Sequence, residues 1–442
     1  MTAISGWGRY PINDTEMIHP RTVDAARRAT VQANPGIARG NGRAYGDAAV
    51  GVRQTIEMAH LNRMRAFDPR TGQLTVEAGL LLTDLIATFL PRGFFPYVVP
   101  GTSFITVGGA IAADVHGKNH HCQGGFGQYV ENILLVLPTG ETIGASREEH
   151  PDLFRATIGG MGLTGTILEA TIRLRPIETG WIRQRTFVAD DLDTTIGALE
   201  CGDSATYSVA WIDCLARGAR LGRSLIFLGE HAALHHLGER HVANRFPLRK
   251  PSMSMPVDAP SFVLNRWTAA AFNELYFRAG ARKAASSTLV PTHPYFFPLD
   301  ALGNWNRMYG RRGFVEHQSV LPIKNAQTTL AEMLDRIAKR GESAFLAVLK
   351  KLGAGSGSLS FPMPGYTLAL DFPIERGLFS VLDELDELVV AAGGRLYLAK
   401  DARQSRATFE AGYSDLSFFS EVRRTVDPAG KLKSRLAERL LI

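Results

Sequence analysis

The sequence predicts an α+β protein of more than one domain. Its 442 residues are enough for two or three domains with sizeable hydrophobic cores. Three glycine-rich loops, each next to a predicted strand, occur before residue 166. After Pro176 the glycine loops thin out, and longer alternating and helical segments follow. This change predicts a domain boundary near residue 177, with a second α+β domain after it.

Local signals give the elements of the first part. Pro20 can open a helix over 20–33, and Pro35 forbids its continuation. The turn at 68–72 contains proline and glycine and leads into a strand. The expected strands are at 73–77, 132–137, 142–144 and 166–174, and a short helix is expected at 82–90.

The second part is less punctuated. Alternating hydrophobicity predicts strands at 205–212 and 366–371, and helical periodicity predicts helices at 325–339 and 378–392. Residues 231–262 are basic and interrupted by prolines, so we expect a long mobile loop there.

Composition excludes several classes of protein. The net charge of +6 comes without a lysine and arginine block interleaved with aromatics, so nucleic-acid binding is not indicated. Cys122, Cys201 and Cys214 form no CxxC pair, which argues against a zinc site and a disulfide framework. No leader and no apolar stretch of about 18 residues is evident. We expect a cytoplasmic protein that is at most peripheral at the inner face of the membrane.

The segment 100–121 is rich in glycine and ends in His-Gly-Lys-Asn-His-His. It has too many glycines to be a good helix and too few polar residues to be a typical surface loop. Buried glycine-rich segments let backbone N–H groups approach anionic groups such as a pyrophosphate. The segment therefore predicts a dinucleotide cofactor whose reactive ring lies beside His116.

The first glycine loop along the chain, 39–46, contains no G-x-G-x-x-G and is not clearly followed by a helix. A Rossmann or P-loop interpretation is therefore poor. One such loop alone would more often be a turn than a cofactor site. Three of them in one region reverse that judgement.

The combination resembles the flavin-binding domain of the vanillyl-alcohol oxidase/p-cresol methylhydroxylase superfamily, and within it a branch that oxidises a lipid-linked pentose. The resemblance spans nearly the whole chain. It rests on the motifs at 6–9, 39–47, 106–112, 116–121, 162–165 and 396–401.

The resemblance implies a two-part FAD-binding domain, formed by 1–177 and by a C-terminal segment, 395–442, that returns to it. It also implies a substrate domain over 178–394 built on an antiparallel sheet. The implied FAD contacts are Arg39, Gly40, Asn41, Gly42, Arg43, Tyr45, Gly101, Thr102, Thr106, Gly108, Gly109, Ala110, Ala113, His116, Gly117, Gly162, Thr164, Ile167, Tyr397 and Lys400.

Many members of the superfamily attach FAD covalently through a histidine in the first loop. Arg43 stands at that position here, and arginine cannot form the histidyl–flavin bond. We therefore predict non-covalent FAD. Arg39 and Arg43 can offset pyrophosphate charge, the alternative being that they serve surface solubility.

Two residues are the catalytic candidates. His116 can position the substrate hydroxyl or accept its proton; a satisfied structural histidine is the alternative. Lys400 is placed by the resemblance at the flavin–substrate junction, where a cation stabilises reduced flavin; the alternative is an exposed lysine. A metal site at His116 and His120 lacks an evident third ligand, and no metal is expected.

The resemblance also implies a substrate pocket, and several of its positions depart from the branch's pattern. Glutamine is expected at Glu316, tyrosine at Phe296 and asparagine at Thr367, and the best-known members carry cysteine at Ala369. Lys350 can meet a substrate phosphate, the alternative being an exposed helix or strand lysine. The full set of implied substrate contacts is Lys118, Phe296, Glu316, Gln318, Lys350, Thr367 and Ala369.

The expected function is FAD-dependent oxidation of a sugar secondary alcohol, at C2 of a polyprenyl-phosphoryl pentose, as the first half of an epimerisation. A short-chain NAD(P)-dependent reductase would reduce the keto product from the other face. The loop 231–262 could cover the pocket and contact anionic lipid headgroups, the alternative being a disordered, solvated loop. Two alternatives remain open: a soluble alditol or aldonolactone oxidase, and a flavin-binding protein with a non-enzymatic role.

Overall fold

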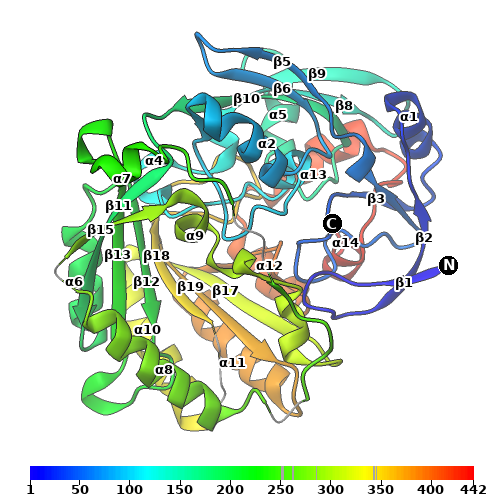
Figure 1. Ribbon diagram of the computed structural model, residues 1–442. Helices are drawn as coiled ribbons and strands as arrows, with labels where there is room; N and C mark the ends of the chain where they lie inside the picture. Colours follow the sequence, from blue (N-terminus) through cyan, green and yellow to red (C-terminus); the bar gives the residue numbers. More distant parts are fainter. Residues whose placement is uncertain (250–252, 261–262, 285, 342–343, 345) are drawn as a thin grey trace.

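The computed structural model describes residues 1–249, 253–260, 263–284, 286–341, 344 and 346–442. Three larger β-sheets and one two-stranded sheet organise this part of the chain, and helices cover the larger ones (Figure 1). The two largest sheets are antiparallel, which confirms the predicted α+β class.

The N-terminal sheet is small and mixed, in the order β1-β2-β4-β3, with β2 and β3 parallel to β4. Helix α1 (Val23–Val31) begins at Thr22, whose side chain accepts a hydrogen bond from the Ala25 amide. Its Ala26 and Ala29 pack in one apolar cluster with Ile56. The strands are β1 (Thr2–Ile4), β2 (Asn13–Ile18), β3 (Gly36–Arg39) and β4 (Gln54–Glu57).

The second sheet has the order β5-β6-β10-β8-β9, with β7 also paired to β10. Helix α2 (Leu82–Phe89) buries Leu82, Leu85 and Phe89 in its core. The strands are β5 (Met64–Asp68), β6 (Gln73–Glu77), β7 (Phe94–Pro96), β8 (Val130–Val136), β9 (Thr142–Ser146) and β10 (Thr166–Pro176). The predicted elements of this region are confirmed. Strand β10 runs on through Pro176, which is tolerated because it is the strand's last residue.

The large sheet has the order β15-β11-β13-β12-β18-β19-β17-β20. Its strands are β11 (Trp181–Ala189), β12 (Tyr207–Ile212), β13 (Ser224–His231), β15 (Ser287–Pro291), β17 (Phe314–Pro322), β18 (Ala347–Leu352), β19 (Gly365–Pro373) and β20 (Arg395–Leu396).

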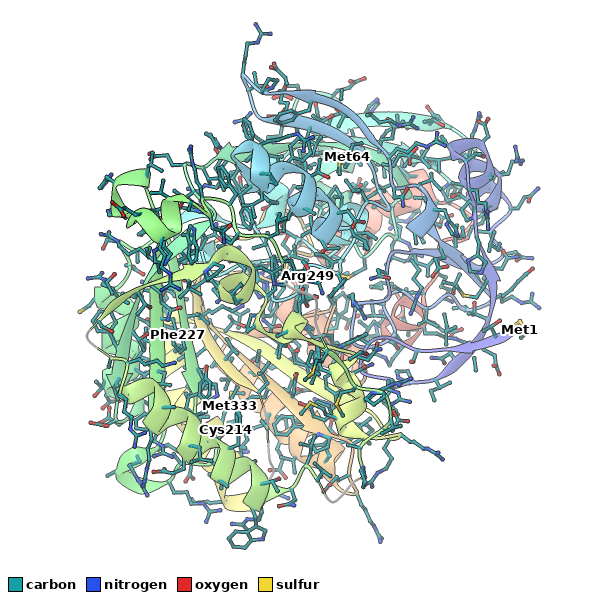
Figure 2. All side chains as sticks on the ribbon, viewed as in Figure 1. Met1, Met64, Cys214, Phe227, Arg249 and Met333 are labelled. Carbon is teal, nitrogen blue, oxygen red and sulfur yellow. The ribbon has the colours of Figure 1, made fainter. Side chains whose placement is uncertain are left out.

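Side chains alternate between the two faces of this sheet. On one face, Leu349, Leu368 and Leu370 pack in one core with buried residues of three helices, among them the wholly buried Met333 (Figure 2). The helices are α6 (Leu192–Cys201), α10 (Ile323–Arg340) and α11 (Leu378–Ala391). The other face, called here the cavity face, carries the intervening side chains. The predicted elements at 205–212, 325–339, 366–371 and 378–392 are therefore confirmed.

The expectation that segment 100–121 is not helical was wrong. Its centre forms helix α3 (Val107–Ala112), which begins where the Thr106 hydroxyl accepts a hydrogen bond from the Gly109 amide. Gly108 lets this helix lie close to β6, because a Cβ there would be only 2.9 Å from the Ala78 Cβ. The second half of the segment leads into α4 (His120–Gln123).

Residues 231–262 are also more structured than a loop, as far as they are described. The described part of this segment contains a 3-10 turn at Leu234–His236, α7 (Glu239–Val242) and β14 (Met253–Ser254), which pairs with β16 (Leu302–Gly303). Residues 250–252 and 261–262 lie outside the described residues. The other helices are α5 (Pro151–Thr157), α8 (Arg266–Ala281), α9 (Thr292–Phe296), α12 (Arg406–Gly412), α13 (Leu416–Val426) and α14 (Arg435–Leu440). None of the described helices combines the length and apolar character needed to cross a membrane.

The C-terminal segment joins the large sheet to the glycine loops. Ala399, which follows β20 in the chain, accepts a hydrogen bond at its carbonyl from the Tyr45 amide. Arg439 of α14 then donates to the carboxylates of Asp47 and Asp401, both at 2.9 Å. These two carboxylate side chains are only 4 % exposed. One guanidinium therefore links the residue that follows the first glycine loop, Asp47, to the residue that follows Lys400, Asp401. We call these three residues, Arg439, Asp47 and Asp401, the Arg439 clamp.

Arg439→Gln is expected to lower the free energy of unfolding by about 3 kcal/mol, because it leaves two buried carboxylates without their cation. Urea denaturation followed by circular dichroism measures the change. The matched control is Arg406→Gln, since Arg406 forms an exposed ion pair with Glu410 that contributes at most about 0.5 kcal/mol. Equal losses of unfolding free energy in the two variants would show that the clamp contributes no more to stability than an exposed ion pair.

Candidate active site

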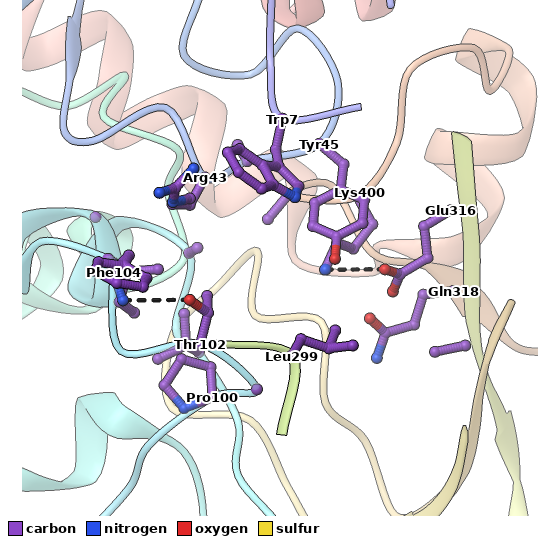
Figure 3. Close-up of a pocket in the computed structure, with 18 of the residues that line it drawn as sticks. Trp7, Arg43, Tyr45, Pro100, Thr102, Phe104, Leu299, Glu316, Gln318 and Lys400 are labelled. Carbon is purple, nitrogen blue, oxygen red and sulfur yellow. Dashed lines mark hydrogen bonds and ion pairs between the residues drawn. The ribbon is translucent and has the colours of Figure 1, made fainter. Parts of the chain in front are cut away.

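A cavity of about 1090 Å³ lies where the glycine loops meet the second sheet and the cavity face of the large sheet. Figure 3 shows side chains from these different parts of the chain pointing toward it, including Arg43, Thr102, Glu316 and Lys400. Residues more than 350 positions apart in sequence thus share one site.

The first glycine loop presents free amides to this cavity. The N–H groups of Asn41, Gly42, Arg43 and Ala44 have no protein acceptor among the described residues. All four residues line the cavity. Gly42 has φ +60°, a left-handed conformation that favours glycine. Consecutive free amides of this kind form a nest for an anionic group, and a pyrophosphate fits that donor set.

Arg43 is held between aromatic rings. Its guanidinium carbon lies 3.8 Å from the centre of the Trp7 ring and 5.4 Å from that of Phe104. Its buried Nε has no hydrogen-bond partner. Arg39 differs, because its guanidinium donates to the backbone carbonyls of Ser5 and Ala49. Arg39 therefore braces the loop, whereas Arg43 keeps a buried donor for a ligand.

Asp300, which stands in no recognisable motif, fixes the start of the second glycine-rich segment, 100–121. Its carboxylate accepts hydrogen bonds from the Thr102 hydroxyl at 2.7 Å and from the Ser103 amide at 2.8 Å. Both Asp300 and Thr102 line the cavity. This contact places the segment around residue 300 against the start of the glycine-rich segment 100–121.

His116 is buried at the centre of the site, 6 % exposed. Its Nε2 lies 3.0 Å from the Gln318 amide nitrogen, and Nδ1 has no partner. With the amide as donor, Nε2 accepts and the proton resides on Nδ1. Burial, together with the charges of Lys350 and Lys400, holds the pKa of His116 well below its usual value. The geometry therefore favours a neutral imidazole that donates a hydrogen bond over one that accepts a proton.

Three lysines line the cavity: Lys118, Lys350 and Lys400. Burial and the charge of Lys350 lower the pKa of Lys118 to about 7. Burial lowers the pKa of Lys350 to about 8, against the opposing effect of Glu316. Lys118 donates to the Tyr295 carbonyl. The chemistry of this cluster suits an anion such as a phosphoryl group.

Lys400 has partners on both sides. Its Nζ lies 2.9 Å from a Glu316 carboxylate oxygen and 3.2 Å from the centre of the Tyr45 ring, as Figure 3 shows. Glu316 on β17 is the register partner of Asp371 on β19. Asp371 is 1 % exposed, and both of its carboxylate oxygens lack a hydrogen-bond partner. Burial and the neighbouring Glu316 charge raise the pKa of Asp371 well above its usual value.

The structure brings most of the expected site residues together. Those that line the cavity are Arg39, Gly40, Asn41, Gly42, Arg43, Tyr45, Gly101, Thr102, Thr106, Gly108, Gly109, Ala113, His116, Gly117, Lys118, Gly162, Ile167, Phe296, Glu316, Gln318, Lys350, Ala369, Tyr397 and Lys400.

Three expected residues do not line it. Ala110 points into the apolar core beneath α3. Thr164 is fully buried, with its hydroxyl 2.9 Å from that of Thr157. Thr367 lies on the cavity face but beneath Gln318, whose amide donates to its hydroxyl. Sequence reasoning also missed Asp300 and Asp371, since isolated aspartates outside a motif carry no local signal.

The site can therefore hold a large ligand with an anionic centre at the first glycine loop. It can also hold a second anionic group beside Lys118 and Lys350. The free amides of the first loop and the orphaned Arg43 Nε fit the pyrophosphate of FAD. No group of three His, Cys, Asp or Glu side chains within the described part of the chain is arranged to hold a metal ion.

Comparison with known proteins agrees with this geometry. Residues 17–146 match a family described as an FAD binding domain. The chain is 38% identical to decaprenylphosphoryl-β-D-ribose oxidase from Mycolicibacterium smegmatis, over 99% of this chain and 97% of that protein. It is 36% identical to an uncharacterised protein from Streptomyces coelicolor, over 82% of this chain and all of that protein. Mouse L-gulonolactone oxidase is 31% identical over 35% of this chain and 36% of its own length.

Asp371→Asn is expected to change how stability depends on pH. Because the pKa of Asp371 is raised in the folded protein, its contribution is full below about pH 4 and declines as pH rises, by up to about 1.4 kcal/mol per pH unit. The amide variant removes this decline. Urea unfolding at pH 5 to 8 should therefore show a difference that grows in favour of the variant.

The matched control is Asp383→Asn, because the Asp383 side chain is 68 % exposed and paired with Arg403. Its stability curve should run parallel to that of the unaltered protein. Parallel curves for Asp371→Asn as well would mean that Asp371 is not protonated in the folded state.

Proposed function

Because the chain belongs to the decaprenylphosphoryl-β-D-ribose oxidase family of the vanillyl-alcohol oxidase/p-cresol methylhydroxylase superfamily, we propose that it oxidises a lipid-linked pentose. It is an FAD-dependent oxidoreductase acting on CH–OH groups, as its relatives are. The proposed substrate is a polyprenyl-phosphoryl pentose, oxidised at C2 to a ketone. The observation that carries this substrate class is the cluster of Lys118, Lys350 and Lys400 on the cavity wall, which suits a phosphoryl group.

The proposed roles follow from the contacts. When bound, FAD supplies the hydride acceptor for the oxidation. The amides of residues 41–44 would hold its pyrophosphate, with Arg43 opposite the same charge. His116 would donate a hydrogen bond from Nδ1 to the substrate hydroxyl. The hydroxyl proton would pass to the Glu316 carboxylate, which is paired with Lys400, and Lys400 would stabilise the negative charge that develops on the substrate oxygen during this transfer.

We propose a division of labour along the chain as well. Residues 1–177 and 395–442 form the FAD-binding part, and 178–394 form the substrate part. The match over 17–146 and the hydrogen bond from Tyr45 to Ala399 support this division. The exception is β20, which starts the C-terminal segment yet pairs with β17.

Two partners belong to the proposal. Oxidation alone does not invert a carbon centre, so a short-chain NAD(P)-dependent reductase would complete the epimerisation. Peripheral membrane contact would come from the basic segment near the exposed Leu248, Met253 and Val257. Co-sedimentation with vesicles containing phosphatidylglycerol supports this contact, and equal recovery with neutral vesicles argues against it.

Non-covalent FAD predicts a simple result. Arg43 replaces the histidine that links flavin in many relatives of the superfamily, so acid precipitation should release the flavin into the supernatant. Absorbance near 450 nm in both fractions measures the split, with a covalent flavoprotein as the control. Yellow colour retained in the pellet would contradict the prediction.

An anaerobic bleaching screen tests the function. We expect a polyprenyl-phosphoryl pentose to reduce the bound flavin, and free pentoses and alditols to leave it oxidised. Lys400→Met should slow bleaching by about 100-fold, in line with loss of one charge-stabilising group, while the protein remains yellow. Bleaching by alditols alone would favour a soluble alditol oxidase. A lack of bleaching by any sugar would favour a non-enzymatic flavoprotein.

A further inference from the structure

The cavity face of the large sheet changes from polar to apolar across its strands. The polar side chains on the cavity wall lie on β17, β19 and the end of β18; they are Glu316, Gln318, Asp371 and Lys350. The apolar ones lie on β12, β13 and the start of β18; they are Val209, Trp211, Phe227 and Val348. From β17 to β13 there are four strand spacings, or roughly 19 Å. That span exceeds the size of one sugar ring.

Helix α8 forms the opposite wall of the apolar end. Thr268, Phe272 and Tyr276 of this helix line the cavity. The helix is attached to the sheet as well, because Asn273 donates to Asp213 at 2.7 Å and a Cβ at Gly280 would clash with Leu225. Figure 1 shows α8 lying across the sheet. The face of α8 that carries Thr268, Phe272 and Tyr276 therefore borders a gap between the helix and the sheet.

This gap, called here the apolar arm, has little to offer a sugar. Trp211 and Tyr276 meet there with ring centres 4.9 Å apart. The Thr268 hydroxyl already donates within its own turn, to the Val263 and Asn265 carbonyls. Moving a hydroxylated ligand from water into such a space would cost its hydrogen bonds with water. A hydrocarbon chain loses nothing comparable and gains from burial.

Lys350 lies at the junction between the polar and the apolar side chains of the cavity face. Lys350 and Val348 are two residues apart on the same face of β18, about 7 Å along the strand. A phosphoryl group at Lys350 would thus place an attached chain beside Val348, at the mouth of the arm. We propose that the apolar arm binds the hydrocarbon chain of the substrate, with the phosphoryl group held at Lys118 and Lys350. This inference rests on the proposed function, which it extends from the sugar to the lipid.

The test uses a ligand that cannot be oxidised as a sugar. Binding of farnesyl phosphate and of methyl phosphate to the flavin-loaded protein is measured by calorimetry. The arm predicts that farnesyl phosphate binds at least about 100-fold more tightly, with a negative heat-capacity change from apolar burial. Equal affinities for the two phosphates would overturn the proposal.

Two variants on α8 give the matched comparison. Phe272 lines the arm and is 51% exposed, whereas Leu275 is 70% exposed and does not line it. Phe272→Ser should weaken farnesyl phosphate binding about tenfold and leave methyl phosphate binding unchanged. Leu275→Ser should change neither by more than about twofold. Equal losses from the two variants would show adsorption to the outside of the helix and would overturn the arm.

The outcomes separate the two proposals. If farnesyl phosphate binds as expected but no lipid-linked pentose bleaches the flavin, the arm stands and the proposed oxidation fails. If a lipid-linked pentose bleaches the flavin while farnesyl phosphate shows no advantage over methyl phosphate, the oxidation stands and the arm fails.

Discussion

The Arg439 clamp is the interaction on which the geometry of the site depends. Asp47 follows the first glycine loop, and Asp401 follows Lys400 directly. Two buried carboxylates would repel each other without a shared cation. The single guanidinium between them therefore fixes how far the first glycine loop lies from Lys400. The position of Lys400 over the Tyr45 ring depends on the same relation.

Much of the fold could be predicted from the sequence, because its boundaries are marked locally. Prolines and the turn at 68–72 delimit the first helix and the first strands. The alternating segments at 205–212 and 366–371 form strands β12 and β19 of the large sheet. Helix α3 could not be predicted, since its glycines lower helix propensity but are required for close packing on Ala78. Here the packing of α3 against the second sheet outweighs the low helix propensity of its glycines.

The candidate site divides in the same way. The glycine loops and the motif around His116 were visible as motifs, and the lysines and Gln318 followed from resemblance. Asp371 was not visible, because it meets Glu316 only through the pairing of two strands 55 residues apart. The protonation state of His116 also could not be predicted from the sequence, because it depends on burial and on the charges of Lys350 and Lys400, which are distant in sequence. Position in sequence reveals a side chain but not its dielectric surroundings.

The lowered pKa values of Lys118 and Lys350 have a consequence for binding thermodynamics. At neutral pH part of the population carries these amines uncharged, because their pKa values are about 7 and about 8. An anionic headgroup that docks between them would restore their charged forms and draw protons from the solvent. Binding of the anion is then coupled to proton uptake, so the affinity of the site for an anion falls as the pH rises.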